Sequence, residues 1–252
     1  MKAPELSYYN IANGIISFST TRHGGCSRGN YGEFNINEYC GDEAEAINKN
    51  RKALAAELGI DADHMIIPHQ THGIETRQIA EDFLSLPENI RKMILEGVDA
   101  VMTNVKGGGV GGSTADCIPI LLYDPEHEAV CAVHAGWRGT VARIVMKAVT
   151  EMRLAYQTIP SNLKAVIGPG ISLDAFEVGN EVYEEFANAN FEMDAISKQM
   201  KVAGTDFEYK WHIDLKECNR RQLLQCGINE ENIQDSDVCT YNNVEDFFSA
   251  RR

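Results

Sequence analysis

The stretch that decides the fold runs from residue 117 to residue 140: CIPILLY at 117–123, DPEHE at 124–128, AVCAVHA at 129–135 and GWRGT at 136–140. The two apolar runs are rich in large or β-branched side chains, which is typical of buried strands. The polar segment between them contains Asp and Pro, which favour tight turns. We therefore predict a hairpin or two adjacent strands, followed by a helix from the GWRGT segment to about Tyr156.

Outward from this hairpin, strand patterns and helix patterns alternate irregularly. Strands are predicted at residues 15–21, 98–105, 164–167 and 237–241, and helices at residues 42–58, 182–189 and 215–226. Gly59 and Gly227 each follow a predicted helix, at the position where glycine is favoured. This order predicts the α+β class, with a mixed β-sheet packed with helices. Since no repeat or linker divides the chain, residues 1–252 are predicted to form a single compact domain.

The composition excludes several classes of function. The chain has 252 residues, of which 23 are Lys or Arg and 37 are Asp or Glu, so its formal charge is −14. Nucleic-acid binding and docking on an anionic membrane both require a basic surface, so we expect neither. A phosphate-handling site would need local positive charge. The sequence shows neither a secretory signal pattern nor an apolar run of about 20 residues, so we expect a cytoplasmic protein.

The number and spacing of the cysteines indicate a protein of a reducing compartment. The chain has seven of them, an odd number, and no C-x-x-C pair occurs: Cys26, Cys40, Cys117, Cys131, Cys218, Cys226 and Cys239. A disulfide framework is more typical of short secreted chains with an even count. We expect most of these residues to be small core side chains. The open question is whether one of them is a metal ligand or a nucleophile.

His72, Cys117 and His134 form a candidate site, although they are separated by 45 and 17 residues. One thiolate and two imidazoles suit Zn²⁺, and three protein ligands leave a fourth position free for catalysis. The spacing matches no compact zinc signature. Three alternatives therefore stay open: ordinary core and loop residues, a His₂Cys copper site, and a Cys117 nucleophile with His134 as its base and Asp116 nearby.

Two segments could bind a small anion. Residues 107–112 (GGGVGG) lack the Lys-Ser/Thr of a phosphate loop, so we predict a flexible β-turn there. Residues 136–140 precede a predicted helix, and Arg138 would add a guanidinium fork. The alternative is that Arg138 pairs with surface carboxylates. Arg51 lies in the helix predicted at 42–58 and either faces solvent or points inward as a second anion ligand.

Two longer motifs resemble the core signature of the laccase-domain family, also called YfiH-type and formerly described as polyphenol oxidase. They are TADCIPILL at 114–122 and AVHAGWRG at 132–139. Shorter matches occur along nearly the whole chain: TRHGGCS at 21–27, FNI at 34–36, QTHG at 70–73, IGPGI at 167–171, FEVG at 176–179 and FFS at 247–249. The HAGWRG segment is highly specific.

The resemblance implies a fold, a metal and an activity. It implies a compact α+β domain grouped with cysteine-hydrolase-like toxins, and places the metal ligands at His72, Cys117 and His134. Zinc is the implied metal, with copper as an alternative. The implied activity is phosphorolysis of adenosine, inosine and methylthioadenosine to the free base and ribose 1-phosphate, with deamination of adenosine. Purine nucleoside and phosphate are thus the expected small-molecule partners.

Four further residues are assigned as catalytic candidates. Arg51 is the first candidate for the phosphate or ribose side, and Arg138 is the second. Asp99 or Asp116 would orient a ligand imidazole or move a proton. Two other activities remain as hypotheses. One is copper-dependent oxidation of phenols. The other is a metal-free cysteine hydrolase that acts on an amide in cell-wall precursor editing.

Overall fold

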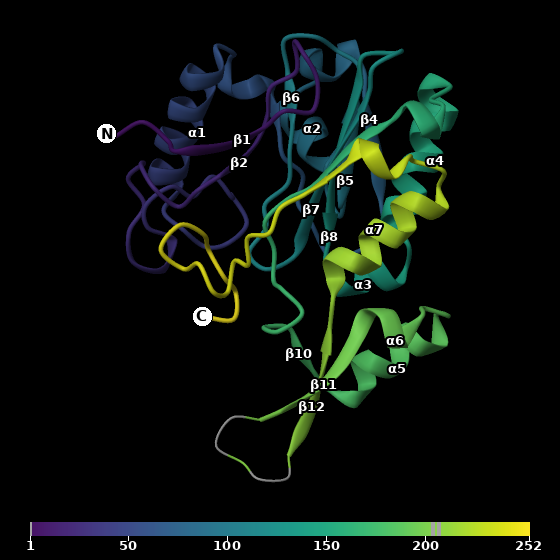
Figure 1. Cartoon of the computed structure of the whole chain (residues 1–252). Coiled ribbons are helices and arrows are strands. Elements are labelled where there is room, and N and C mark those ends of the chain that lie inside the picture. The colour runs from purple at the N-terminus through teal and green to yellow at the C-terminus, as the bar shows by residue number, and fades with distance from the viewer. Residues whose placement is uncertain (1, 203–204, 206–207) are drawn as a thin grey trace.

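The centre of the fold is a six-stranded mixed sheet with strand order β13-β9-β7-β8-β5-β4. The computed structural model describes residues 2–202, 205 and 208–252 (Figure 1). The bounds of the sheet strands are β4 (Thr76–Ile79), β5 (Ala100–Thr103), β7 (Ile118–Asp124), β8 (Ala129–Ala135), β9 (Lys164–Ile167) and β13 (Ile233–Asp235). The pairs β4–β5 and β9–β13 are parallel, and the other pairs are antiparallel.

The predicted hairpin is confirmed as β7–β8, at the middle of this sheet. Ile118 pairs with Ala135 and Asp124 pairs with Ala129, so the hairpin is in register over its whole length. Both strands are largely buried, because one face of the hairpin lies in the main core and the other packs against the N-terminal segment around Ile11. Burial on both faces explains why the strands read as continuous apolar runs. The register also places residue 117 beside the end of β8.

Helices pack on and around the sheet. Their bounds are α1 (Ala44–Leu58), α2 (Glu88–Ile94), α3 (Trp137–Val141), α4 (Ile144–Tyr156), α5 (Asn180–Asn188), α6 (Met193–Ile196) and α7 (Leu215–Gln225). α4 packs on β4, β5 and β8, and α7 packs on α3 and α4. Ile144 and Met152 of α4 are fully buried in the main core, so truncation of either side chain to alanine is expected to cost about 2–5 kcal/mol. The mixed α+β class is therefore confirmed.

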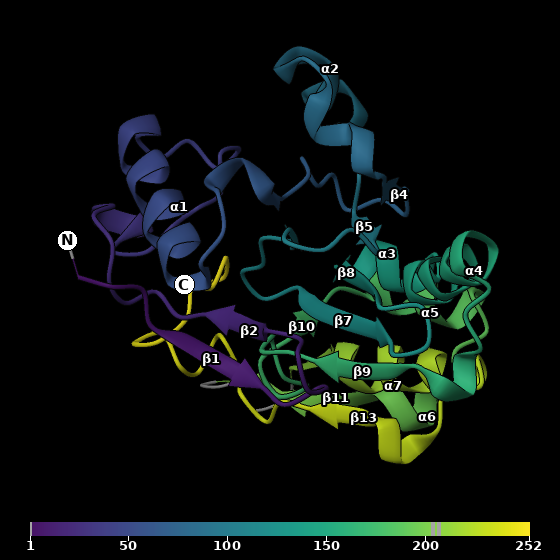
Figure 2. The same ribbon diagram turned by 90° about the horizontal axis from the view of Figure 1, so that it is seen from above.

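Smaller sheets surround this centre. β1 (Leu6–Tyr9) pairs with β2 (Ser17–Thr20), and β3 (Met65–Ile66) pairs with β6 (Gly109–Val110). β10 (Glu177–Val178), β11 (Ser197–Lys201) and β12 (Tyr209–Ile213) form an antiparallel sheet that carries α5 and α6 below the central sheet in Figure 1. Figure 2 shows α1 and α4 on opposite sides of the molecule. None of the helices in the described residues has the length and apolar character needed to cross a membrane.

The single helix predicted from the GWRGT segment to Tyr156 is wrong, because the structure breaks it into α3 and α4. Arg143 has φ 66° and so adopts the left-handed conformation. Its guanidinium donates to the carbonyl oxygen of Ala189 at 3.0 Å and lies 3.6 Å from the ring centroid of Phe191. These contacts to the α5–α6 connection stabilise a conformation that local propensity disfavours.

The strand predicted at residues 237–241 is also wrong. The last strand of the sheet is β13, which ends at Asp235. Beyond it, Cys239 forms an isolated bridge with Gly170. Lys216 donates to the carbonyl oxygens of Ser236 and Val238, and the Thr240 hydroxyl donates to Asp116. The flexible turn predicted at 107–112 needs a correction as well, since Gly109 and Val110 form β6.

Candidate metal centre

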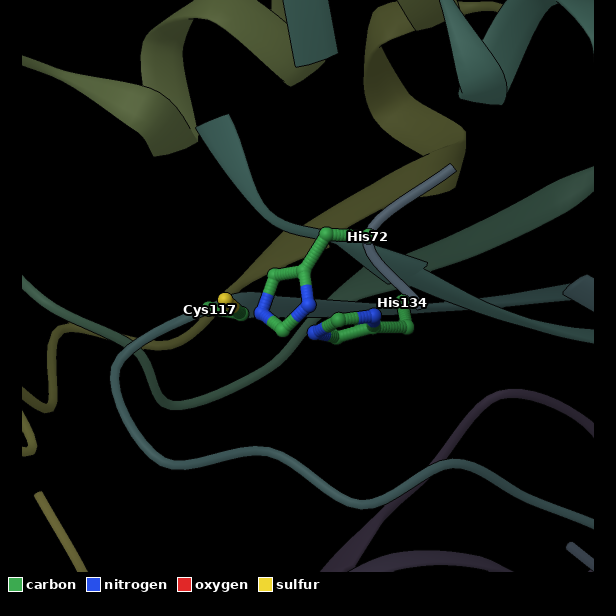
Figure 3. Close-up of side chains that lie close together, drawn as sticks. All are labelled: His72, Cys117 and His134. Carbon is green, nitrogen blue, oxygen red and sulfur yellow. The ribbon is translucent and has the colours of Figure 1, made fainter. Parts of the chain in front are cut away.

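His72, Cys117 and His134 converge at one end of the β7–β8 hairpin (Figure 3). Cys117 directly precedes β7, and His134 is the next-to-last residue of β8. His72 comes from the loop between β3 and β4. The ligand atoms of the three side chains lie within 4.8 Å of one another, and the two imidazole rings meet edge to face. The hairpin register thus brings two of the residues together, and the third joins them from a separate loop.

Asp99 organises both histidines at once. This carboxylate lies just before β5 and is 1% exposed. Its oxygens accept hydrogen bonds from the backbone N–H groups of Thr71 at 3.2 Å, His72 at 3.0 Å and Gly73 at 2.7 Å. These bonds stabilise the left-handed backbone of His72, whose φ is 63°. Three consecutive amides around one carboxylate form an anion-binding nest that fixes the loop.

Asp99 also holds the ring of His134. The His134 Nδ1 atom lies 2.7 Å from an Asp99 oxygen. An ionised carboxylate only accepts hydrogen bonds, so Nδ1 must be the donor, and Nε2 remains for a metal. Burial raises the pKa of Asp99, but the hydrogen bonds from His134, Gly73 and Thr71 outweigh burial and lower it below its usual value. Asp99 is thus hydrogen-bonded to the His134 imidazole, and its role in orienting a metal ligand stays a prediction.

The electrostatics of the triad favour a thiolate. Burial raises the pKa of Cys117, but hydrogen bonding and charge from His134 and His72 outweigh it and bring this pKa to about 7. Burial lowers the pKa of His134, yet the bonds to Asp99 and Cys117 raise it to about 9. The site therefore stabilises an anionic sulfur, the form that binds a metal or acts as a nucleophile.

The three side chains fit a tetrahedral metal. With metal–sulfur bonds of about 2.3 Å and metal–nitrogen bonds of about 2.0 Å, ligand atoms lie roughly 3.5 Å apart. Side-chain shifts on the order of 1 Å would shorten the observed separations of up to 4.8 Å to that value. His72 is exposed while His134 is buried, so the metal would lie near the surface with one side open to a substrate.

Gly136 makes room for the triad. A Cβ atom at this position would lie 2.9 Å from His72 Cδ2 and 3.1 Å from Cys117 Sγ. The backbone of Gly136 is ordinary, with φ −68°, so alanine is opposed here by contact with the two side chains and not by backbone strain. This explains physically why the HAGWRG segment needs a glycine after His134 and Ala135.

If the triad binds zinc, Gly136→Ala is expected to lower zinc affinity by at least about tenfold, because it displaces two of the candidate ligands. Competition with a chromophoric chelator measures the affinity. Gly109→Ala is the matched control, since a Cβ atom there meets only Ile60 Cδ1 at 4.0 Å. Equal zinc affinity in both variants would show that the site adapts to the added methyl group.

Gln70 links the loops that carry His72 and Cys117. Its Oε1 accepts from the Ser113 backbone N–H at 2.7 Å, and its Nε2 donates to the Ser113 carbonyl oxygen at 2.9 Å. Sequence reasoning missed this role and that of Gly136. Both residues belong to the motifs of the resemblance, but only the tertiary structure shows what they contact.

The remaining candidate residues lie in three different surroundings. Arg51, on α1, points inward, where it donates to the Met65 carbonyl oxygen at 3.0 Å and lies 3.3 Å from Glu38. Arg138, on α3, is exposed and stacks on the Trp137 ring at 4.3 Å. Asp116 precedes Cys117, but its carboxylate faces residues 240–251.

The fold and site together define a class: a mixed α+β protein with a His–Cys–His centre at the end of a central hairpin. A family model described as multi-copper polyphenol oxidoreductase laccase matches residues 16–252. The chain therefore belongs to this laccase-like family, as the sequence motifs indicated.

Two named relatives align with almost the whole chain. A purine nucleoside phosphorylase from Bacteroides thetaiotaomicron is 44% identical over 98% of this chain and 88% of its own length. Adenosine deaminase RL5, from an unknown prokaryotic organism, is 39% identical over 98% of this chain and 92% of its own length.

Solved structures support the fold. The crystal structure of the Bacillus licheniformis hypothetical protein YfiH superposes with a TM-score of 0.87 at 27% identity, covering 99% of this chain and 92% of that one. The crystal structure of YlmD from Geobacillus stearothermophilus gives a TM-score of 0.85 at 28% identity, covering 97% of this chain and 88% of that one.

Proposed function

We propose that this chain is a zinc-dependent purine nucleoside enzyme. It would cleave adenosine, inosine and methylthioadenosine with phosphate to give the free base and ribose 1-phosphate, and it would also deaminate adenosine. The observation that carries this proposal is the His72, Cys117 and His134 centre in a chain 44% identical to a protein named purine nucleoside phosphorylase. We further propose that residues 1–252 act as one domain in the cytoplasm.

A bound zinc ion would supply Lewis-acid chemistry at the reacting centre. The chain's own residues would position the reactants. In phosphorolysis, a phosphate oxygen attacks C1′ of the ribose, the C1′–N9 bond breaks, and the leaving purine takes up a proton. Asp99 fixes the His134 ring throughout, and this rigidity preserves the reactive geometry.

Arg138 becomes our preferred phosphate ligand. Stacking on Trp137 engages the face of the guanidinium, while its N–H groups lie in the plane and can bind an anion in bidentate fashion. The Arg51 guanidinium already binds Met65 and Glu38, so a role for Arg51 on the ribose side requires those partners to share it. Arg138 follows Gly136 by two residues and would supply the local positive charge that a chain of net charge −14 needs to bind phosphate.

A direct assay tests the function. Zinc-loaded protein is incubated with adenosine, with and without phosphate, and adenine, inosine and hypoxanthine are resolved by chromatography. Adenine should form only with phosphate, whereas inosine should form in both cases. His72→Ala, purified in parallel, controls for contaminating enzymes. Absence of turnover of adenosine, inosine and methylthioadenosine by zinc-loaded protein would refute the proposal.

The number of metal-binding groups distinguishes the proposed chemistry from copper-dependent oxidation of phenols. Laccase-type oxidation moves electrons through several coppers. In the described part of the chain, one group of at least three His, Cys, Asp or Glu side chains has the geometry to hold a metal ion, and that group is the triad. This supports chemistry at one metal over a multicopper mechanism. Oxygen uptake with a phenol that depends on added copper would favour the alternative.

Because the pKa of Cys117 is lowered, a cysteine hydrolase remains a second candidate function. Alkylation of Cys117 distinguishes it from the zinc-dependent nucleoside enzyme. In metal-free protein, iodoacetamide should modify Cys117 with a rate that falls as the pH drops through about 7, since only the thiolate reacts. Burial raises the pKa of Cys131 to about 12, so that thiol should stay unmodified. Peptide mass spectrometry measures both.

Zinc should protect Cys117 from this reaction, because a metal-bound thiolate is a poor nucleophile. Equal labelling with and without zinc would support the hydrolase and remove Cys117 from the ligand set.

A further inference from the structure

Asp116 joins the metal centre to the segment of residues 240–251. One of its carboxylate oxygens accepts from the Thr240 hydroxyl at 2.8 Å. The other accepts from the Ser249 hydroxyl at 3.0 Å and from the Arg251 backbone N–H at 3.1 Å. This carboxylate is therefore satisfied by a distant part of the chain, although it stands next to the ligand Cys117.

The backbone of Asp116 needs such support. Its φ is 84°, a region that residues with a Cβ atom rarely adopt and that persists where surrounding contacts enforce it. Its carbonyl oxygen accepts from the Ile171 N–H at 2.8 Å. Because this residue is bonded through both its side chain and its backbone, the peptide that leads into Cys117 has a fixed direction.

The segment that supplies these bonds is itself held from several sides. Arg22 donates to the Val244 carbonyl oxygen at 2.9 Å and lies 4.8 Å from the Phe248 ring centroid. His23 pairs with Asp246 at 2.9 Å. In Figure 1, this yellow segment runs from the sheet to the side of the molecule where β1, β2 and α1 lie.

A second anchor lies close to the Ser249 contact. The Arg251 guanidinium donates to the Glu177 carbonyl oxygen at 2.7 Å and lies 4.8 Å from the Phe176 ring centroid. Residues 240–251 are thus held by the N-terminal region at one point and by the β10 region at another. They present their donors to Asp116 at fixed positions.

We propose that residues 240–251 form a strap that positions the Cys117 ligand through Asp116. Asp116 and Ser249 are then positioning residues, and Asp116 acts through its hydrogen bonds to the strap and not by moving a proton. This inference rests on the proposed metal site, but it concerns metal geometry and does not depend on which nucleoside reacts. Groups that hydrogen-bond directly to a metal ligand are typically worth about 10–100-fold in metal affinity. This range is the upper bound for the strap, which acts through the peptide that precedes Cys117.

Cobalt titration tests the strap without any turnover assay. Co²⁺ bound to a thiolate gives a charge-transfer absorption band whose energy and intensity report the cobalt–sulfur geometry. Ser249→Ala removes one donor and should weaken Co²⁺ binding about 3–10-fold with a changed band, and Ser249→Thr should restore both. Asp116→Asn places an amide N–H₂ against donors and should weaken binding about 10–100-fold.

Ser85→Ala is the matched control, because the Ser85 hydroxyl donates to the Asp82 carbonyl oxygen at the end of an exposed 3-10 helix. Its Co²⁺ affinity and band should equal those of the unmodified protein. Wild-type affinity and an unchanged band in Ser249→Ala would overturn the proposal even if Asp116→Asn fails to fold. If the unmodified protein binds no Co²⁺ through Cys117, the proposed metal site is wrong, and the proposal that the strap positions a metal ligand is wrong with it.

Discussion

Cys117→Ala is expected to purify without stoichiometric metal and to lose purine nucleoside turnover. The variant removes the thiolate and leaves two imidazoles, one of them on an exposed loop. Loss of a partner that only orients a ligand costs about 10–100-fold in metal affinity, so loss of the ligand itself should cost more than about 100-fold. Elemental analysis together with the adenosine assay measures both effects.

Cys131→Ala is the control for this variant. Cys131 is a buried thiol in β8, so its truncation leaves a small cavity and should cost about 1–2 kcal/mol of stability without loss of metal. Stoichiometric zinc retained by Cys117→Ala would remove Cys117 from the ligand set and would return the nucleophile hypothesis to first place.

Asp99→Asn is expected to weaken the metal site and the fold together. The amide loses the charge that balances His134, and its N–H₂ group would face the donors of Thr71 or Gly73. Breaking a buried charge pair on one side costs on the order of 3–5 kcal/mol. Zinc affinity should also fall about 10–100-fold, because the His134 ring and the His72 loop lose their common support. Urea unfolding and chelator competition measure the two effects.

The pH dependence of the free energy of unfolding is a second measurement on Asp99→Asn. Because the folded-state pKa of Asp99 lies below its usual value, its contribution is fully present above about pH 4 and is lost as the pH falls through the lowered pKa. The difference in unfolding free energy between the unmodified protein and Asp99→Asn should therefore shrink in acid.

Asp124→Asn is a closely matched control at the opposite end of β7. Asp124 is also a buried carboxylate, and it binds the His127 ring at 2.9 Å and the Thr158 hydroxyl at 2.5 Å. Its loss should destabilise the fold by a similar amount while zinc affinity stays unchanged. If both variants lost zinc equally, the effect of Asp99→Asn would be one of general stability and not of ligand orientation.

The local elements of this fold were readable because burial leaves a periodic pattern in the sequence. The two apolar runs around the Asp-Pro turn determined the central hairpin, and helical spacing followed by Gly227 determined α7. Its C-cap is Cys226, and Gly227 has φ 90°, as the sequence predicted. In each case the information lies within one element and its ends, so no distant contact was needed.

Local patterns failed where distant contacts outweigh propensity. No residue between Trp137 and Tyr156 marks the break at Arg143, because Ala189 and Phe191 stabilise it from another part of the chain. Residues 237–241 read as a strand, but their pairing is limited to an isolated bridge between Cys239 and Gly170. The Val238 carbonyl oxygen also accepts from Lys216, and the Thr240 hydroxyl donates to Asp116.

By itself, the sequence determined the α+β class, the central hairpin and, through the family motifs, the identity of the three candidate ligands. Only the tertiary structure decided that Asp99 joins two of them, that Gly136 makes room for them and that Asp116 faces a distant segment. The physical reason is the range of the contacts. The spacing of apolar side chains along the chain records which face of an element is buried, whereas hydrogen bonds between residues 27 to 133 positions apart, such as those of Asp99 and Asp116, leave no periodic pattern in the sequence.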